Sequence, residues 1–124
     1  MLAVFAAALA ACGGSTAVAH TPIVFGTAGG NIVPFRVAIQ PNGSVRGRAD
    51  GILSRQISPA RVGGLTSEIQ QAHLGSRQCP DTSPDVASRY IRAGGRTVTV
   101  HGSCEPGFER AWNDLTAAVG RPTS

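Results

Sequence analysis

The chain has no lysine: all eleven of its basic residues are arginine. Against seven acidic residues they leave a formal net charge of +4. This balance is too small for a typical nucleic-acid-binding domain, so nucleic acid is not an expected partner. Arginine binds carboxylates and phosphates through paired hydrogen bonds. The charge therefore favours an acidic protein or an anionic membrane surface as partner.

The N-terminal apolar run is too short to cross a bilayer. It extends from Leu2 to Ala11, far below the roughly 20 residues that a transmembrane helix needs. A short apolar region followed by small residues is typical of a secretory signal, and it predicts a signal peptide over residues 1–11. Signal peptides normally open with a basic residue and none precedes His20, so we expect translation to start upstream of Met1. The alternative is a soluble protein with an apolar N-terminal strand or helix.

Cysteine is scarce, with only Cys12, Cys79 and Cys104. The run Leu9-Ala10-Ala11-Cys12 resembles a bacterial lipobox. The resemblance implies lipid on Cys12, a flexible tether over residues 12–21 and a location on the outer face of the cytoplasmic membrane. Cys79 and Cys104 then remain, and because an exported domain is oxidised we expect a disulfide between them. The alternative is a metal site, but no His or Cys lies at zinc-ligand spacing from either.

Motifs for catalysis are missing as well. The sequence has no Gly-x-Ser-x-Gly elbow, phosphate-binding loop or dinucleotide fingerprint. The three histidines, His20, His73 and His101, are more typical of surface residues than of ligands or bases. Asp81 and Asp85 share a loop but lack a bidentate glutamate at calcium-loop spacing. We therefore expect no catalytic residue, no metal site and no cofactor.

Apolar periodicity predicts a single α+β domain over residues 22–121. Alternating apolar residues predict strands, and apolar residues at helical spacing predict two helices. The order β-β-β-α-β-β-α indicates an antiparallel sheet of four to five strands with two helices packed on one face. The predicted strands begin at Ile23 and cover 32–39, 45–49, 88–93 and 97–102, and the helices begin at Pro59 and span 108–119.

Turn residues predict the hairpin registers. Pro41-Asn42-Gly43 favours a three-residue loop with Gly43 left-handed, which pairs Ile39 with Val45 and keeps the apolar face intact. Gly94-Gly95 predicts a two-residue turn that sets Ile91 opposite Val98.

The same residues predict where the helices begin and end. Ser58 is a typical cap residue before a proline at the first helical position. Gly75 and Gly120 are expected to end the two helices. Trp112 lies on the apolar stripe of the second helix and is expected in the core.

Alternation also directs a set of arginines away from the core. We expect one sheet face to remain uncovered, because both helices pack on the other. The exposed face would carry Arg36, Arg46, Arg48 and Arg92. A solvated strand face and a contact surface for anionic lipid or an acidic partner are both consistent with this pattern.

The arrangement of elements resembles emfourin-like proteins, small inhibitors of thermolysin-like metalloproteases. The matching features are Ile23-Val24-Phe25 running into Gly29-Gly30 and a long hairpin, then a strand end and helix over 53–74, a hairpin over 85–100 and a closing helix over 108–119. The resemblance implies binding rather than catalysis, with a secreted metalloprotease as partner.

The leading expectation is a lipid-anchored, non-catalytic binding protein that inhibits a secreted metalloprotease. Its contacts would come from Gly29, Gly30 and Asn31 on a protruding loop over 27–31, where glycine lets backbones approach closely. The first alternative is a module that binds the membrane surface or another envelope component through the exposed arginines. The second is a small hydrolase with an unrecognised site.

Overall fold

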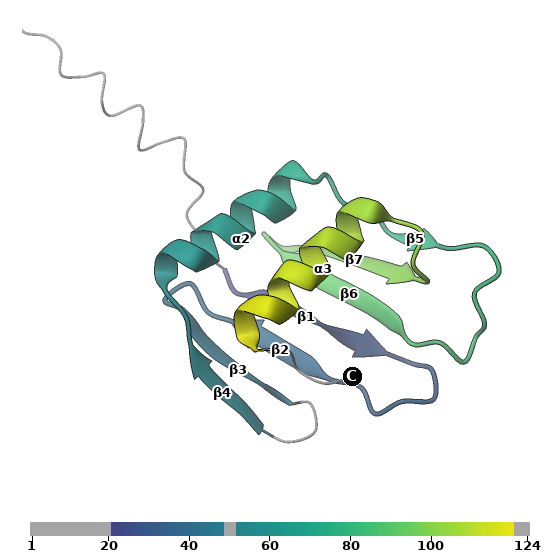
Figure 1. The fold of residues 1–124 in the computed structure, drawn as a ribbon, viewed down its shortest axis with the longest axis horizontal. Coiled ribbons are helices and arrows are strands. Elements are labelled where there is room, and N and C mark those ends of the chain that lie inside the picture. Colours follow the sequence, from purple (N-terminus) through teal and green to yellow (C-terminus); the bar gives the residue numbers. More distant parts are fainter. Residues whose placement is uncertain (1–20, 49–51, 121–124) are drawn as a thin grey trace, which may run out of the picture.

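The computed structural model describes residues 21–48 and 52–120. For residues 52–54 it describes only the backbone. It is an α+β fold in which two helices lie across one face of a seven-stranded sheet (Figure 1). The elements are β1 (Ile23–Ala28), β2 (Arg36–Ile39), β3 (Ser44–Arg48), β4 (Ile52–Gln56), α2 (Pro59–Gln71), β5 (Arg77–Gln78), β6 (Ser88–Ala93), β7 (Arg96–His101) and α3 (Pro106–Val119).

The sheet has the order β4-β3-β2-β1-β6-β7-β5, which places the first strand at its centre. The class is as predicted, but the expected four to five strands fall short by β4 and β5. The expectation of an entirely antiparallel sheet was also wrong, because β5 pairs with β7 in parallel. β5 has only two residues, and the residues of β4 do not alternate between apolar and polar, so neither strand has a periodic signal in the sequence.

Both predicted hairpin registers are confirmed. Ile39 pairs with Val45, and Gly43 is left-handed with φ of +92°. The Gln40 amide donates to the Ser44 carbonyl at 2.8 Å, which closes the loop. Across the second hairpin Ile91 lies opposite Val98. Turn chemistry, together with the continuity of the apolar face in the first hairpin, therefore predicts both registers.

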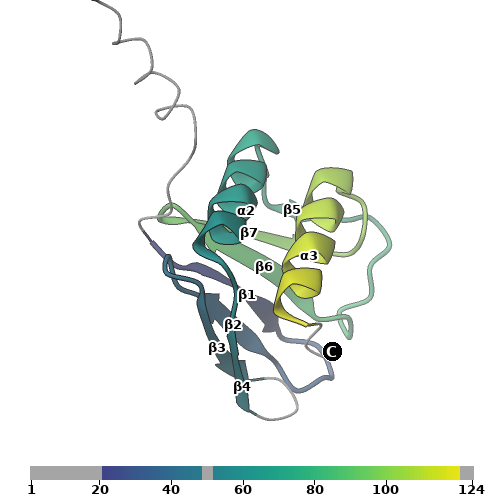
Figure 2. The same cartoon turned by 60° about the vertical axis from the view of Figure 1, so that its left-hand side comes forward.

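The two helices lie side by side on the same face of the sheet (Figure 2). Ser58 caps α2 through its Oγ, which accepts from the Arg61 amide at 3.1 Å. This helix ends at Gln71, before the predicted stop at Gly75, and His73 takes up the left-handed conformation instead. Gly120 ends α3 as predicted, with φ of +86°.

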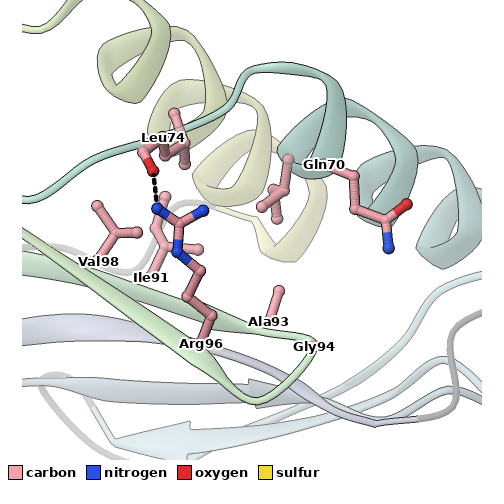
Figure 3. A pocket seen from close by; sticks show the side chains of 8 residues that line it. Gln70, Leu74, Ile91, Ala93, Gly94, Arg96 and Val98 are labelled. Atoms are coloured by element: carbon pink, nitrogen blue, oxygen red, sulfur yellow. Dashed lines mark hydrogen bonds between the residues drawn. The ribbon is translucent and has the colours of Figure 1, made fainter.

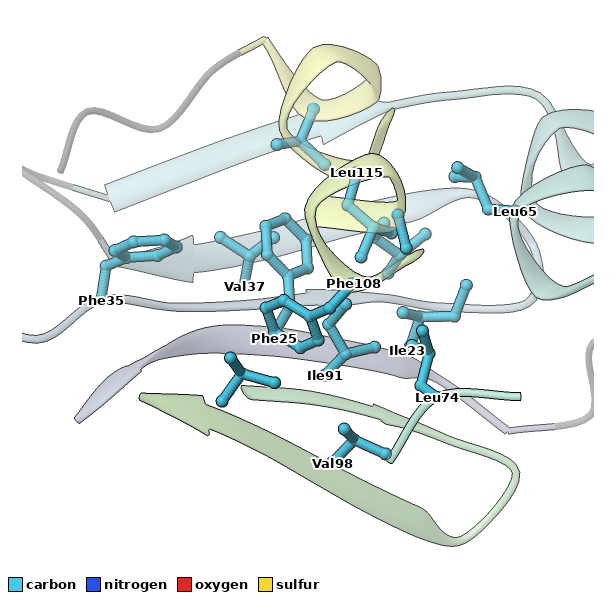
Figure 4. Packing of buried hydrophobic residues seen from close by; sticks show 14 of the residues in the cluster. Ile23, Phe25, Phe35, Val37, Leu65, Leu74, Ile91, Val98, Phe108 and Leu115 are labelled. Carbon is cyan, nitrogen blue, oxygen red and sulfur yellow. The ribbon is translucent and has the colours of Figure 1, made fainter. Parts of the chain in front are cut away.

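Between the helices and the sheet lies one apolar core (Figure 4). Phe25, Phe35 and Phe108 are almost fully buried, and Trp112 packs among them with ring centroids 5.5–6.0 Å away. Trp112 is partly buried and packs against the core, as expected for its place on the apolar stripe, and it lies between α3 and the central strands.

The disulfide predicted between Cys79 and Cys104 is present, with a Cα–Cα distance of 5.7 Å. It ties the end of β5 to the segment that leads into α3. Within the described ranges, no helix has both the length and the apolar character needed to cross a membrane.

Candidate functional site

The exposed arginines gather on the sheet face opposite the helices. Two rows run across β6, β1, β2 and β3, and the residues of each are adjacent by strand register. Arg36, Arg46, Arg48 and Arg92 are all exposed. We call this surface the arginine face; at ordinary strand spacing it is about 14 Å wide from β6 to β3. The rows are Arg92-Val24-Ala38-Arg46 and Tyr90-Gly26-Arg36-Arg48.

The charge on this face is of one sign. None of the seven described strands contains an aspartate or a glutamate. Arg36 and Arg48 lie directly opposite each other, an arrangement in which like charges destabilise a sheet. Among the described residues no acidic side chain pairs with these four arginines, so the face presents their guanidinium groups to solvent.

Acidic residues lie instead on the helices and the loops. Glu109 in α3 pairs with Arg89, which also donates to the Gly102 carbonyl at 2.8 Å. Glu105, just before α3, pairs with Arg77 at 2.9 Å. Both ion pairs involve arginines outside the arginine face, so the protein neutralises some of its basic residues and leaves these four exposed.

Tyr90 adds an aromatic group to the arginine face. A Cβ placed on Gly26 would lie 2.9 Å from the Tyr90 hydroxyl, so the phenol ring covers that glycine. Gly26 is opposite both Tyr90 and Arg36, so the phenol and the Arg36 side chain lie in the same row of the arginine face. Alternation placed Tyr90 on this side, but nothing local indicated that it covers a glycine on the strand next to the Arg36–Arg48 pair.

The loop predicted to protrude is only partly free. Gly30 packs against a neighbouring segment: an added Cβ would lie 2.6 Å from the Ala87 nitrogen. The Asn31 amide donates to the Asp85 carbonyl at 3.1 Å, which fixes the loop further. Gly29 has open space around it. The predicted tip is therefore part of a longer connection, from Gly29 to Phe35, which is held near its start by the contacts of Gly30 and Asn31.

Beyond that anchor the same connection exposes apolar side chains. Ile32 is 43% exposed and Val33 79%. Val86, on the segment that holds the loop, is 47% exposed. We call the surface formed by Gly29, Ile32, Val33 and Val86 the apolar loop end. It lies at the opposite end of β1 from Ile23, where the chain enters the sheet (Figure 1).

A carboxyl pair between the helices was missed by sequence reasoning. Glu68 of α2 is half-buried beside Asp114 of α3, and its Oε2 has no hydrogen-bond donor among the described residues. A hydrogen bond with the Asp114 carboxyl, which requires a shared proton, raises the pKa of Glu68 to about 7, and burial adds to the effect. No signal in the sequence could reveal this pair, because the two residues meet only when the helices pack.

The histidines have structural contacts or lie outside the described residues. The His101 Nε2 lies 2.8 Å from the Val86 carbonyl, and its Nδ1 lies 2.6 Å from the Gln78 amide. His101 therefore links β7 to the loop before β6. His73 serves as the left-handed residue after α2, and His20 lies outside the described residues.

Asp81 and Asp85 lie in the loop between β5 and β6. Asp81 is left-handed in the loop after β5, and Asp85 accepts the loop contact from Asn31. Over residues 21–48 and 52–120 no group of three or more His, Cys, Asp or Glu side chains could hold a metal ion. Cys12 and the predicted tether up to His20 lie outside the described residues.

Comparison with known proteins returns no relative: no family model, no curated protein and no solved structure matches the chain.

Proposed function

We propose that the protein is a lipid-anchored, non-catalytic binding protein outside the cytoplasmic membrane. The observation that carries its binding role is the arginine face, with four exposed arginines and no acidic residue in any described strand. A diacylglyceryl group carries two lipid chains, which are enough for stable anchoring, and a basic surface on the anchored domain is attracted to anionic headgroups. The arginine face therefore lies against anionic headgroups beside the anchor at Cys12.

The test compares two triple variants of the unlipidated protein in binding to vesicles with and without phosphatidylglycerol. One replaces Arg36, Arg46 and Arg48 with Gln; its control replaces Arg55, Arg61 and Arg110, which lie outside the face. Each basic residue near an anionic surface contributes about 1 kcal/mol, so the first variant loses about hundredfold in affinity at low salt. Because both variants lose the same charge, equal losses would refute the arginine face as the site.

Lipidation of Cys12 is tested separately from the binding to vesicles. Mass spectrometry of the native protein should find a diacylglyceryl group on an N-terminal Cys12, and Cys12→Ala should release the protein from the membrane fraction or leave it unprocessed. A mature protein that begins elsewhere, or an unmodified Cys12, would contradict the anchor.

A second candidate function is inhibition of a secreted metalloprotease through the apolar loop end. The observation in its favour is the exposure of Ile32 and Val33 beside the unobstructed Gly29. This end of the sheet faces away from the point where the chain enters β1, so an N-terminal anchor leaves it accessible to a partner.

The matched variants for this candidate are Gly29→Trp and Gly95→Trp. Both glycines are left-handed, with φ of +75° and +76°, and both have open space around them, but Gly95 lies in the β6–β7 turn. The parent and Gly95→Trp should remove the activity of a thermolysin-like protease stoichiometrically, and Gly29→Trp should not. A parent that leaves the protease fully active at equimolar concentration excludes inhibition of that target.

A further inference from the structure

A cavity of about 240 Å³ lies between the end of α2 and the β6–β7 hairpin, on the helix side of the sheet (Figure 3). Its walls are apolar: Ile91 and Val98 come from the strands, and Ile69 and Leu74 come from α2 and the chain beyond it. It is separate from both the arginine face and the apolar loop end. Nothing in the sequence pattern pointed to it.

Two local features leave this cavity open. The helix ends at Gln71, so the chain crosses the hairpin without a further turn of helix to cover it. At the mouth, Gly94 has no side chain, and a Cβ added there would meet nothing within 4 Å. The short helix and the glycine turn together keep a hollow over the apolar strand residues.

One cationic group stands at the rim. The Arg96 side chain rises from the hairpin, and its Nη2 donates to the Leu74 carbonyl at 2.7 Å (Figure 3). A guanidinium has five N–H donors, so most remain available. No acidic residue lines the cavity, and in the described part of the chain Arg96 forms no ion pair.

An apolar hollow with one guanidinium at its mouth complements a ligand with an aliphatic chain and an anionic head. The planar fork of arginine suits a carboxylate in particular. A water molecule occupies about 30 Å³, and a methylene group is of similar size. The cavity volume of about 240 Å³ therefore accommodates about eight such groups.

We propose that this cavity binds a linear aliphatic carboxylate of about six to eight carbons, a length set by the cavity volume. The carboxylate accepts hydrogen bonds from Arg96, which keeps its bond to the Leu74 carbonyl. The chain lies over Ile91 and Val98, against Ile69. This site operates independently of the proposed membrane or protease binding.

The experiment titrates the isotope-labelled full-length chain with butyrate, hexanoate, octanoate and 1-octanol, and follows the backbone amide signals. Octanoate should shift the signals of Ile91, Val98 and Leu74, and each added methylene should tighten binding about fourfold. Arg96→Gln should weaken octanoate about tenfold and leave 1-octanol unchanged, while Arg96→Lys should keep part of the octanoate affinity.

The controls separate this site from general attraction to the basic protein. Arg92→Gln removes the same charge from the opposite face of the hairpin and should leave octanoate binding unchanged. Ala93→Leu should fill the cavity and remove binding, with an otherwise native amide spectrum. Equal weakening by Arg92→Gln and Arg96→Gln, shifts confined to the arginine face or the N-terminal segment, or no saturable shift at all would overturn the proposal.

Discussion

Gly29 and Gly30 share a backbone conformation but have opposite surroundings. Their φ angles are +75° and +68°, in the left-handed region that side chains rarely adopt. Gly29 is open, whereas Gly30 abuts the backbone of Ala87. A variant at Gly30 therefore disturbs the loop itself, and Gly29 is the cleaner position from which to test partner binding.

At the residue scale, we predict that Gly30→Ala destabilises the protein more than Gly29→Ala. Gly29→Ala bears the left-handed conformational penalty alone, about 1 kcal/mol. Gly30→Ala adds a clash with backbone that cannot rotate away, for a total of about 3 kcal/mol. Urea unfolding of both variants measures the difference. Equal losses would show that the loop does not press on Ala87 in solution.

At the element scale, the contact between α2 and α3 depends on a proton. Glu68 and Asp114 face each other across the two helices, with Arg61 and Arg110 near enough to oppose the rise in the Glu68 pKa. The hydrogen bond with Asp114 and the burial of Glu68 outweigh those cations. Carboxyl contacts of this kind stabilise a helix pair only while one of the two groups is protonated.

The free energy of unfolding should therefore depend on pH through Glu68. The Glu68 pKa rises from 4.5 to about 7 on folding, so the native state binds the proton more tightly than the unfolded state. The contribution is therefore complete below pH 4.5 and is lost as pH rises through about 7. Partial exposure reduces the loss to about 1 kcal/mol.

Glu68→Gln and Asp114→Asn should each flatten that pH dependence, because either one removes the shared proton. Chemical unfolding between pH 4 and 8 measures the slope for parent and variants. If both variants keep the slope of the parent, then other groups cause it.

At the scale of the whole molecule, the disulfide holds the edge of the sheet. β5 is only two residues long and pairs with β7 alone, so it has little stability of its own. The bond joins Cys79, directly after this strand, to Cys104, which precedes α3. It thus connects the edge of the sheet with the helix layer that covers the core.

We predict that Cys79→Ser with Cys104→Ser costs about 3 kcal/mol, from the entropy of a closed loop of this length. Cys79 is buried in the apolar core and Cys104 packs against it, but most of the core is made of other side chains, so the variant should remain folded at room temperature. Calorimetry compares the two proteins, with the reduced parent as a second reference. A variant as stable as the parent would mean that the unfolded chain is already restricted without the bond.

Several features follow from neighbours in the sequence. Asn42-Gly43 and Gly94-Gly95 determined the hairpin registers, because few backbone conformations join two strands in so few residues. Alternation then directed Arg36, Arg46, Arg48 and Arg92 to one face, since side chains along a strand point to opposite sides in turn. Ser58 set the start of α2 for a similarly local reason: its side chain caps a free backbone amide.

Other features depend on elements far apart in the chain. The central position of β1, the additional strands β4 and β5 and the parallel pairing were decided by which edges met during folding. Glu68 came to face Asp114 only through the packing of two helices, and the Arg96 cavity exists only because α2 stops short of the hairpin. By itself the sequence determined both hairpin registers, the start of α2 and the face on which the arginines are exposed. The tertiary structure decided which groups met, because those contacts depend on long-range packing that no short segment encodes.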